Sequence, residues 1–171
     1  SLVGLLGRDP PSRAMLSRSL TYHNPRLRVK VGDLVFPNPL GLAGGFDKNG
    51  VAVEGLAACG FGSVEVGSVS ALPSDGNPVR PRLFRAQEDE AIVVFYGVPN
   101  DGAAAVAQRL SRTVLPVPLG INLVETNTGK PSDTDQVIEE LISAAGPFLE
   151  IADYITLNLN CPNTSAGHSP F

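Results

Sequence analysis

The stretch 38–50, which reads NPLGLAGGFDKNG, limits the possible folds of this chain more than any other. Its apolar run, 40–43, is too short for a helix and lies between Pro39 and the pair Gly44-Gly45, which is the pattern of a buried strand in a parallel sheet. Glycines at the end of a strand let a flat ligand approach the backbone, and Lys48 adds a cation three residues further on. The alternative interpretation is a plain turn followed by a solvated lysine.

Short apolar runs alternate with helix-like stretches along most of the chain, which is the rhythm of βα units. The four predicted core strands are 40–43, 62–68, 118–123 and 154–159. The predicted helices between them cover 51–59, 102–113 and 131–145. Because sequential right-handed crossovers leave no other simple arrangement, we expect four parallel strands side by side in chain order, with the helices on the outer face. Their expected carboxyl ends are Ala43, Gly67, Asn122 and Leu159.

The predicted helices carry apolar stripes. In the second helix the stripe comprises Ala103, Val106, Ala107 and Leu110, and Asn100-Asp101 precedes it as a candidate cap. In the third helix Pro131-Ser132-Asp133 precedes a stripe of Val137, Ile138, Leu141, Ile142 and Ala145.

Four βα units are half of a (β/α)₈ TIM barrel, which typically needs about 250 residues. The chain has 171 residues, so we expect 26–171 to be the first half of such a barrel within a longer protein. Residues 1–25 would form a separate N-terminal segment with a short helix from Pro10 to Leu20. Alternating residues on both sides of Gly32-Asp33 predict a β-hairpin ahead of the first core strand, and 83–85 with 91–95 predict a second hairpin.

Composition excludes several functional classes. The formal charge of −4 gives no electrostatic reason to bind nucleic acid. No apolar run approaches the roughly 18 residues that a transmembrane helix needs. Cys59 and Cys161 form no disulfide framework, so a reducing compartment such as the cytoplasm is expected. His23 and His168 are isolated and no cluster has metal-ligand spacing, so no metal site is predicted.

Polar residues and glycines gather where the predicted strands end, and in a barrel these ends converge on one mouth. The set comprises Ala43, Gly44, Lys48, Gly67, Ser68, Asn122, Asn158, Cys161 and Asn163. Amides both donate and accept hydrogen bonds, which suits a heterocycle whose edge alternates carbonyl and N–H groups.

Cys161 is the most reactive side chain of this set, because a thiol can act as a general base when a nearby cation favours its thiolate. The alternative is an inert small apolar residue, which is the interpretation we give Cys59 at a helix end. Asn158 is expected to point inward, where a buried amide needs partners.

At these residues the chain resembles the dihydroorotate dehydrogenase family, FMN-dependent (β/α)₈ barrels of pyrimidine synthesis. The resemblance runs from about Val29 to Thr164 and is carried by NPLGLAGGFDKNG, FGSVEVGSVS, PLGINL and LNLNCPNT. It implies oxidation of dihydroorotate to orotate, with hydride transfer to the flavin.

The resemblance also implies roles for individual residues. Ala43 and Gly44 would back the flavin ring, while Gly67, Ser68 and Asn122 would contact FMN. Lys48 and Asn158 would contact both flavin and substrate, Asn163 would hold the pyrimidine edge, and Cys161 would be the catalytic base.

Two classes of the family are mixed in this chain. AGGFDKNG and GNPVRPRLFR resemble the quinone-linked, membrane-associated class, whereas a cysteine at the base position marks the soluble class. The electron acceptor implied is therefore quinone or another oxidant, and the quinone-linked class implies peripheral association with the inner membrane.

The chain also departs from the family pattern. It has Val94, Val98 and Pro99 where the family has Asn, Phe and Asn, and Val124-Glu125 where Gly-Lys is usual. A valine cannot replace the hydrogen bonds of an asparagine, a loss of about 1–3 kcal/mol at a buried polar site. Two alternatives follow, namely a flavin enzyme of the same barrel acting on another small heterocycle, or a non-catalytic half-barrel that binds a partner. Because the FMN phosphate site belongs to the second half of such barrels, we expect 1–171 alone to bind FMN weakly or not at all and to be inactive.

Overall fold

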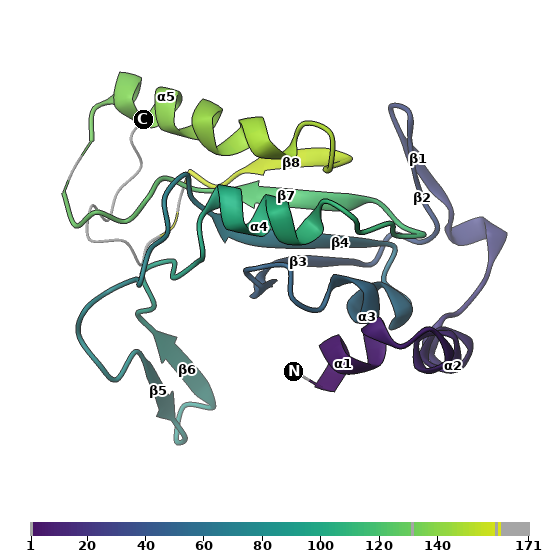
Figure 1. The fold of residues 1–171 in the computed structure, drawn as a ribbon. Coiled ribbons are helices and arrows are strands. Elements are labelled where there is room, and N and C mark those ends of the chain that lie inside the picture. The colour runs from purple at the N-terminus through teal and green to yellow at the C-terminus, as the bar shows by residue number, and fades with distance from the viewer. Residues whose placement is uncertain (1, 131, 160, 162–171) are drawn as a thin grey trace.

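The computed structural model describes residues 2–130, 132–159 and 161 (Figure 1). Its main sheet has four parallel strands in the order β3-β4-β7-β8, which confirms the predicted order and direction. The strands are β3 (Gly41–Asp47), β4 (Ser63–Val69), β7 (Leu119–Leu123) and β8 (Tyr154–Leu157).

The predicted strand ends were partly wrong. β3 continues past the glycine pair to Asp47, because its pairing with β4 shifts register between Leu42 and Asp47 instead of stopping. β4 likewise extends two residues beyond Gly67, whereas β8 stops at Leu157. The expected burial of the first strand was also wrong, because β3 is an edge strand of the described sheet and most of its residues are exposed.

Three helices cover one face of the sheet, as predicted, and share one apolar core with it. They are α3 (Val53–Ala58), α4 (Ala103–Leu110) and α5 (Thr134–Ala145). Val64 and Val66 of β4, Ile121 of β7 and Phe148 of the following 3-10 turn η2 (Gly146–Phe148) are fully buried in this core.

The apolar stripe predicted for α4 is confirmed, since Ala103, Val106, Ala107 and Leu110 are all buried. Its predicted cap was wrong. The residue at the N-cap is Gly102, and the Asn100 side chain instead accepts a hydrogen bond from the Gly102 backbone N–H at 2.9 Å. Asn100 thereby holds the loop that leads into the helix.

In α5 the predicted stripe was wrong at two positions. Val137, Leu141 and Ala144 are buried, whereas Ile138 is 44% and Ile142 67% exposed. The buried residues lie at i, i+4 and i+7, a narrower face than the predicted stripe. The start of the helix is fixed by a reciprocal capping box between Asp133 and Gln136.

The N-terminal segment contains two helices instead of the single predicted one. The predicted helix is α2 (Pro10–Leu20), and α1 (Leu2–Arg8) precedes it. Gly7 of α1 lies against Gly55 of α3, and Arg13 of α2 pairs with Glu54 of α3 at 2.8 Å. A 3-10 turn, η1 (Pro25–Leu27), leads from these helices to the sheet region.

Both predicted hairpins are present. The first pairs β1 (Val29–Val31) with β2 (Leu34–Phe36), and the second pairs β5 (Leu83–Ala86) with β6 (Ala91–Val94). The second hairpin projects away from the main sheet (Figure 1). No helix of the described residues is long and apolar enough to cross a membrane.

The contact between α1 and α3 gives a stability prediction. A Cβ at Gly55 would overlap the backbone carbonyl oxygen of Val3, so Gly55→Ala must displace α1. We expect a loss of about 1–3 kcal/mol in the free energy of unfolding, measured by urea denaturation. Gly146→Ala is the matched control, because a Cβ at Gly146 has nothing within 4 Å. Equal unfolding midpoints for the two variants would contradict the proposed close packing.

Candidate active site at the carboxyl ends of the strands

The sheet face opposite the helices carries polar side chains. Because successive residues of a strand point to opposite faces, burial of Val64 and Val66 against the helices places Glu65 on the other face. The same alternation places Asn122 of β7 opposite the buried Ile121 and Leu123. This polar face is the inner face of a barrel wall.

Hydrogen bonds join these polar side chains across three strands. Glu65 accepts from Asn122 Nδ2 through Oε1 at 2.9 Å and from Thr156 Oγ1 through Oε2 at 2.9 Å. Asn122 Oδ1 accepts from Ser68 Oγ at 2.5 Å, and Ser68 Oγ accepts from Asn158 Nδ2 at 3.0 Å. Three predicted site residues (Ser68, Asn122 and Asn158) therefore lie in one hydrogen-bonded series.

Two of the predicted glycines lie directly against this series. A Cβ at Gly44 would come within 3.0 Å of Glu65 Oε1 and 3.1 Å of Asn122 Cβ. Gly67 has φ of +129° and a Cβ there would overlap the backbone oxygen of Asn122. Gly67 therefore requires glycine, and at Gly44 a side chain would displace Glu65 or Asn122, so both glycines let neighbouring strands approach closely.

Lys48 lies at the same end of the sheet, beyond β3. Its ammonium group is 5.0 Å from the centre of the Tyr96 ring, a cation–π contact. Burial lowers the pKa of Lys48, the charge that Cys161 can carry opposes this lowering, and Arg82 adds to it. These causes place Cys161 and Arg82 near Lys48, as the predicted site requires of the thiol.

Of the remaining predicted site residues, the structure describes Cys161 and Ala43 but not Asn163. Cys161 is half-buried and forms no disulfide, and Ala43 is exposed on β3. Asn163, the predicted contact to the substrate edge, lies outside the described residues. Among the described residues, no three His, Cys, Asp or Glu side chains are grouped as metal ligands.

Sequence reasoning missed Glu65, Tyr96 and Arg82. Glu65 had a readable signal, because it is the single charge within the otherwise apolar and small stretch GSVEVGS and therefore marks an inward-facing position. The other two come from the 71–100 excursion, and nothing in local spacing relates that segment to Lys48.

A cavity of about 750 Å³ opens beside Lys48. Two arginines, Arg80 and Arg82, and two aspartates, Asp75 and Asp101, share its lining. Arg82 Nε is buried without a hydrogen-bond partner among the described residues. The lining is therefore strongly polar and carries three cationic side chains, which suits an anionic ligand.

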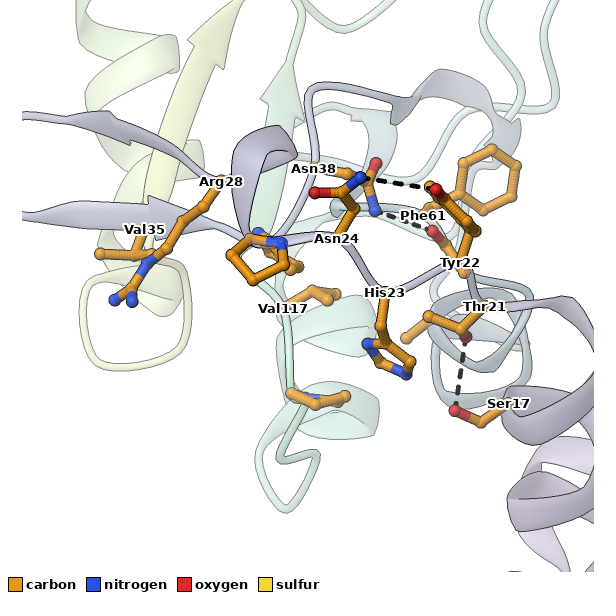
Figure 2. A pocket seen from close by; sticks show the side chains of 15 residues that line it. Ser17, Thr21, Tyr22, His23, Asn24, Arg28, Val35, Asn38, Phe61 and Val117 are labelled. Carbon is orange, nitrogen blue, oxygen red and sulfur yellow. Dashed lines mark hydrogen bonds between the residues drawn. The ribbon is translucent and has the colours of Figure 1, made fainter.

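A second cavity, of about 520 Å³, lies at the opposite end of the strands (Figure 2). It is bounded by Asn38, Phe61 and Val117, which precede β3, β4 and β7, and by His23 and Arg28 of the N-terminal segment. None of the predicted site residues that the structure describes lines it. The candidate active site is therefore the carboxyl-end cluster.

A parallel βα sheet with helices on one face, and glycines, amides and a lysine at the carboxyl ends of its strands, defines a ligand-binding (β/α)₈ barrel of which the chain forms a part. The sequence model of the family described as dihydroorotate dehydrogenase matches residues 26–171. The chain belongs to the dihydroorotate dehydrogenase family.

Individual relatives agree with this assignment. The chain is 43% identical over 153 residues to a dihydroorotate dehydrogenase (quinone) of Synechococcus sp. (strain JA-3-3Ab), covering 89% of this chain and 40% of the relative. It is 41% identical over 154 residues to the corresponding protein of Mycolicibacterium smegmatis, covering 90% and 42%. The chain thus spans less than half the length of these relatives.

Solved structures show the same fold. Dihydroorotate dehydrogenase from Eimeria tenella in complex with ferulenol superimposes with a TM-score of 0.70 at 32% identity, covering 91% of this chain and 45% of that one. The ligand-free form from the same organism gives a TM-score of 0.72 at 29% identity, covering 98% and 47%.

The environment of Lys48 gives a prediction on titration. In the folded protein without ligand, Lys48 should lose its proton at a lower pH than in the unfolded chain, because burial disfavours the ammonium form. Between its folded and unfolded pKa values the unfolded chain binds more protons, so this residue's contribution to stability rises with pH in that window. The measurement is NMR titration of lysine side chains labelled with ¹³C at Cε. Coincident Lys48 midpoints in the folded and the urea-unfolded protein would contradict the burial of Lys48.

Proposed function

We propose that the protein containing this chain oxidises dihydroorotate to orotate, with FMN as cofactor and Cys161 as general base. The observation that carries the proposal is the meeting of the Ser68–Asn122–Asn158 series with Lys48 and Cys161 at one end of the sheet. The names of the relatives, dihydroorotate dehydrogenase (quinone), support the reaction and suggest a quinone as electron acceptor.

The residues present fit a flavin ring. The inner face offers amide and hydroxyl groups at Ser68, Asn122 and Asn158, which match an edge of alternating carbonyl and N–H groups. At Gly44 the absence of a side chain lets the backbone lie against Glu65 and Asn122, since a Cβ there would come within 3.0 Å of Glu65 Oε1. Lys48 adds a cation for an anionic group of flavin or substrate.

In the proposed mechanism the chain's own residues orient the reactants and move one proton. Lys48 and the cationic lining around it hold the substrate carboxylate. The Cys161 sulfur takes a proton from a ring carbon of dihydroorotate. When bound, the flavin supplies the acceptor for the hydride that leaves the neighbouring carbon.

The base assignment is tested by Cys161→Ala in the full-length protein that contains these residues. Flavin should stay bound, while its reduction by dihydroorotate slows by about 10²-fold or more, because general-base catalysis is lost. Stopped-flow absorbance of the flavin measures this rate. Cys59→Ala, at the other free thiol, is the control and should leave the rate unchanged. An unchanged rate in Cys161→Ala would reject Cys161 as the base.

A second candidate is oxidation of a different small heterocycle by the same kind of site. Val98 and Glu125 favour it. Val98 is buried with a positive φ of 55°, and Glu125 has a buried Oε1 with no hydrogen-bond partner among the described residues. A carboxylate oxygen in that state can accept a hydrogen bond from a donor group of a ligand.

Turnover separates the two candidates. We expect dihydroorotate to reduce the flavin of the full-length protein faster than other dihydropyrimidines do, and quinone to reoxidise it faster than fumarate or NAD⁺. Faster reduction by a different heterocycle would favour the second candidate. A protein that stays colourless after incubation with FMN would reject both and leave a non-catalytic partner-binding role.

A further inference from the structure

Glu65 holds a position in the site that neither the family resemblance nor the proposed mechanism uses. It lies in the middle of β4, and its two carboxylate oxygens accept hydrogen bonds from different neighbouring residues, Asn122 and Thr156. Through Asn122 it is the first member of the series that runs on to Ser68 and Asn158.

The direction of every hydrogen bond in this series follows from the charge of Glu65. A carboxylate can only accept, so the Asn122 amide must turn its NH₂ group toward Glu65 and its oxygen toward Ser68. Ser68 must then donate its single hydroxyl proton to Asn122 Oδ1. Its oxygen is left to accept, which requires Asn158 to present its NH₂ group.

Without a carboxylate at position 65 the direction of these hydrogen bonds would not be determined. Amides can be turned by 180° and a hydroxyl can either donate or accept, so each of the three links has two arrangements. An acceptor that cannot donate, placed at one end, selects one of them for the whole series.

We propose that Glu65 is a positioning residue that fixes which atoms Asn122 and Asn158 present at the ligand site. The consequence for FMN rests on the proposed function, whereas the orientation of the two amides does not. Glu65 acts through Asn122 and Ser68 and need not touch the ligand itself.

The test compares Glu65→Gln with Thr156→Val in the full-length protein that contains residues 1–171. Glutamine keeps the size of the side chain but can donate, so it removes the constraint. Thr156→Val removes the hydrogen bond that Thr156 donates to Glu65 Oε2 and leaves the series to Asn158 intact. The measurements are the dissociation constant for FMN, from flavin fluorescence, and the hydrogen exchange of the Asn122 and Asn158 side-chain NH₂ groups without flavin, by NMR.

Glu65→Gln should weaken FMN binding by about tenfold, the equivalent of one buried hydrogen bond, and speed exchange of both NH₂ groups. Thr156→Val should change FMN affinity by less than about twofold and leave the NH₂ exchange of both asparagines slow. Equal losses in the two variants, or unchanged exchange at Asn158 in Glu65→Gln, would overturn the proposal.

Ser68→Ala keeps the proposal testable if Glu65→Gln fails to fold. It interrupts the series between Asn122 and Asn158, so exchange should accelerate at Asn158 but remain slow at Asn122. Slow exchange at Asn158 in Ser68→Ala would reject transmission through Ser68. Where Glu65→Gln does fold, adding it to Ser68→Ala should no longer affect Asn158, and additive effects there would also reject that transmission. If the unmodified protein binds no FMN, the proposed function fails and the exchange data alone decide the role of Glu65.

Discussion

The two-residue alternation of β4 and β7 is the constraint on which the rest of this structure depends. One set of side chains, including Val64, Val66 and Ile121, is fully buried against the helices and supplies the centre of the core. The other set, Glu65 and Asn122, faces the opposite side and can be polar only because its members bond to one another. A one-residue slip in register would exchange the two sets, burying a carboxylate and exposing the valines, so the core and the site specify the same register.

The order of the strands could be predicted from the sequence because it depends on local signals. Short apolar runs bounded by glycine and proline locate β3, β4, β7 and β8, and the handedness of crossovers arranges them. The exact ends could not be predicted, since β3 reaches Asp47 through a register shift that depends on its partner strand. Whether Ile138 and Ile142 of α5 are buried also depends on neighbouring elements, and periodicity alone carries no such information.

The candidate site likewise contains residues that could be predicted from the sequence and residues that could not. Ser68, Asn122 and Asn158 could be predicted because each follows or ends an apolar run, and parallel strands bring such ends together. Tyr96 and Arg82 could not, because they reach Lys48 from a long excursion whose path is set by tertiary contacts. Asn100 illustrates those contacts. Its amide donates to the Ser70 hydroxyl at 2.8 Å and to the Val98 carbonyl at 3.0 Å, and so ties the end of the excursion to the residue after β4.

The glycines of the site show why so small a part of the sequence can specify its chemistry. Gly44 and Gly67 leave no space for side chains between the backbone and the row of polar groups, so the strands lie directly against the amide and hydroxyl groups of this face. Recognition by such a surface depends on the direction of hydrogen bonds more than on shape, because amides and hydroxyls of similar size can either donate or accept. A partly buried carboxylate removes that ambiguity, and its partial desolvation is tolerable because Asn122 and Thr156 both donate to it. The residue that makes the site specific can therefore be one that contacts the ligand-binding residues and does not contact the ligand itself.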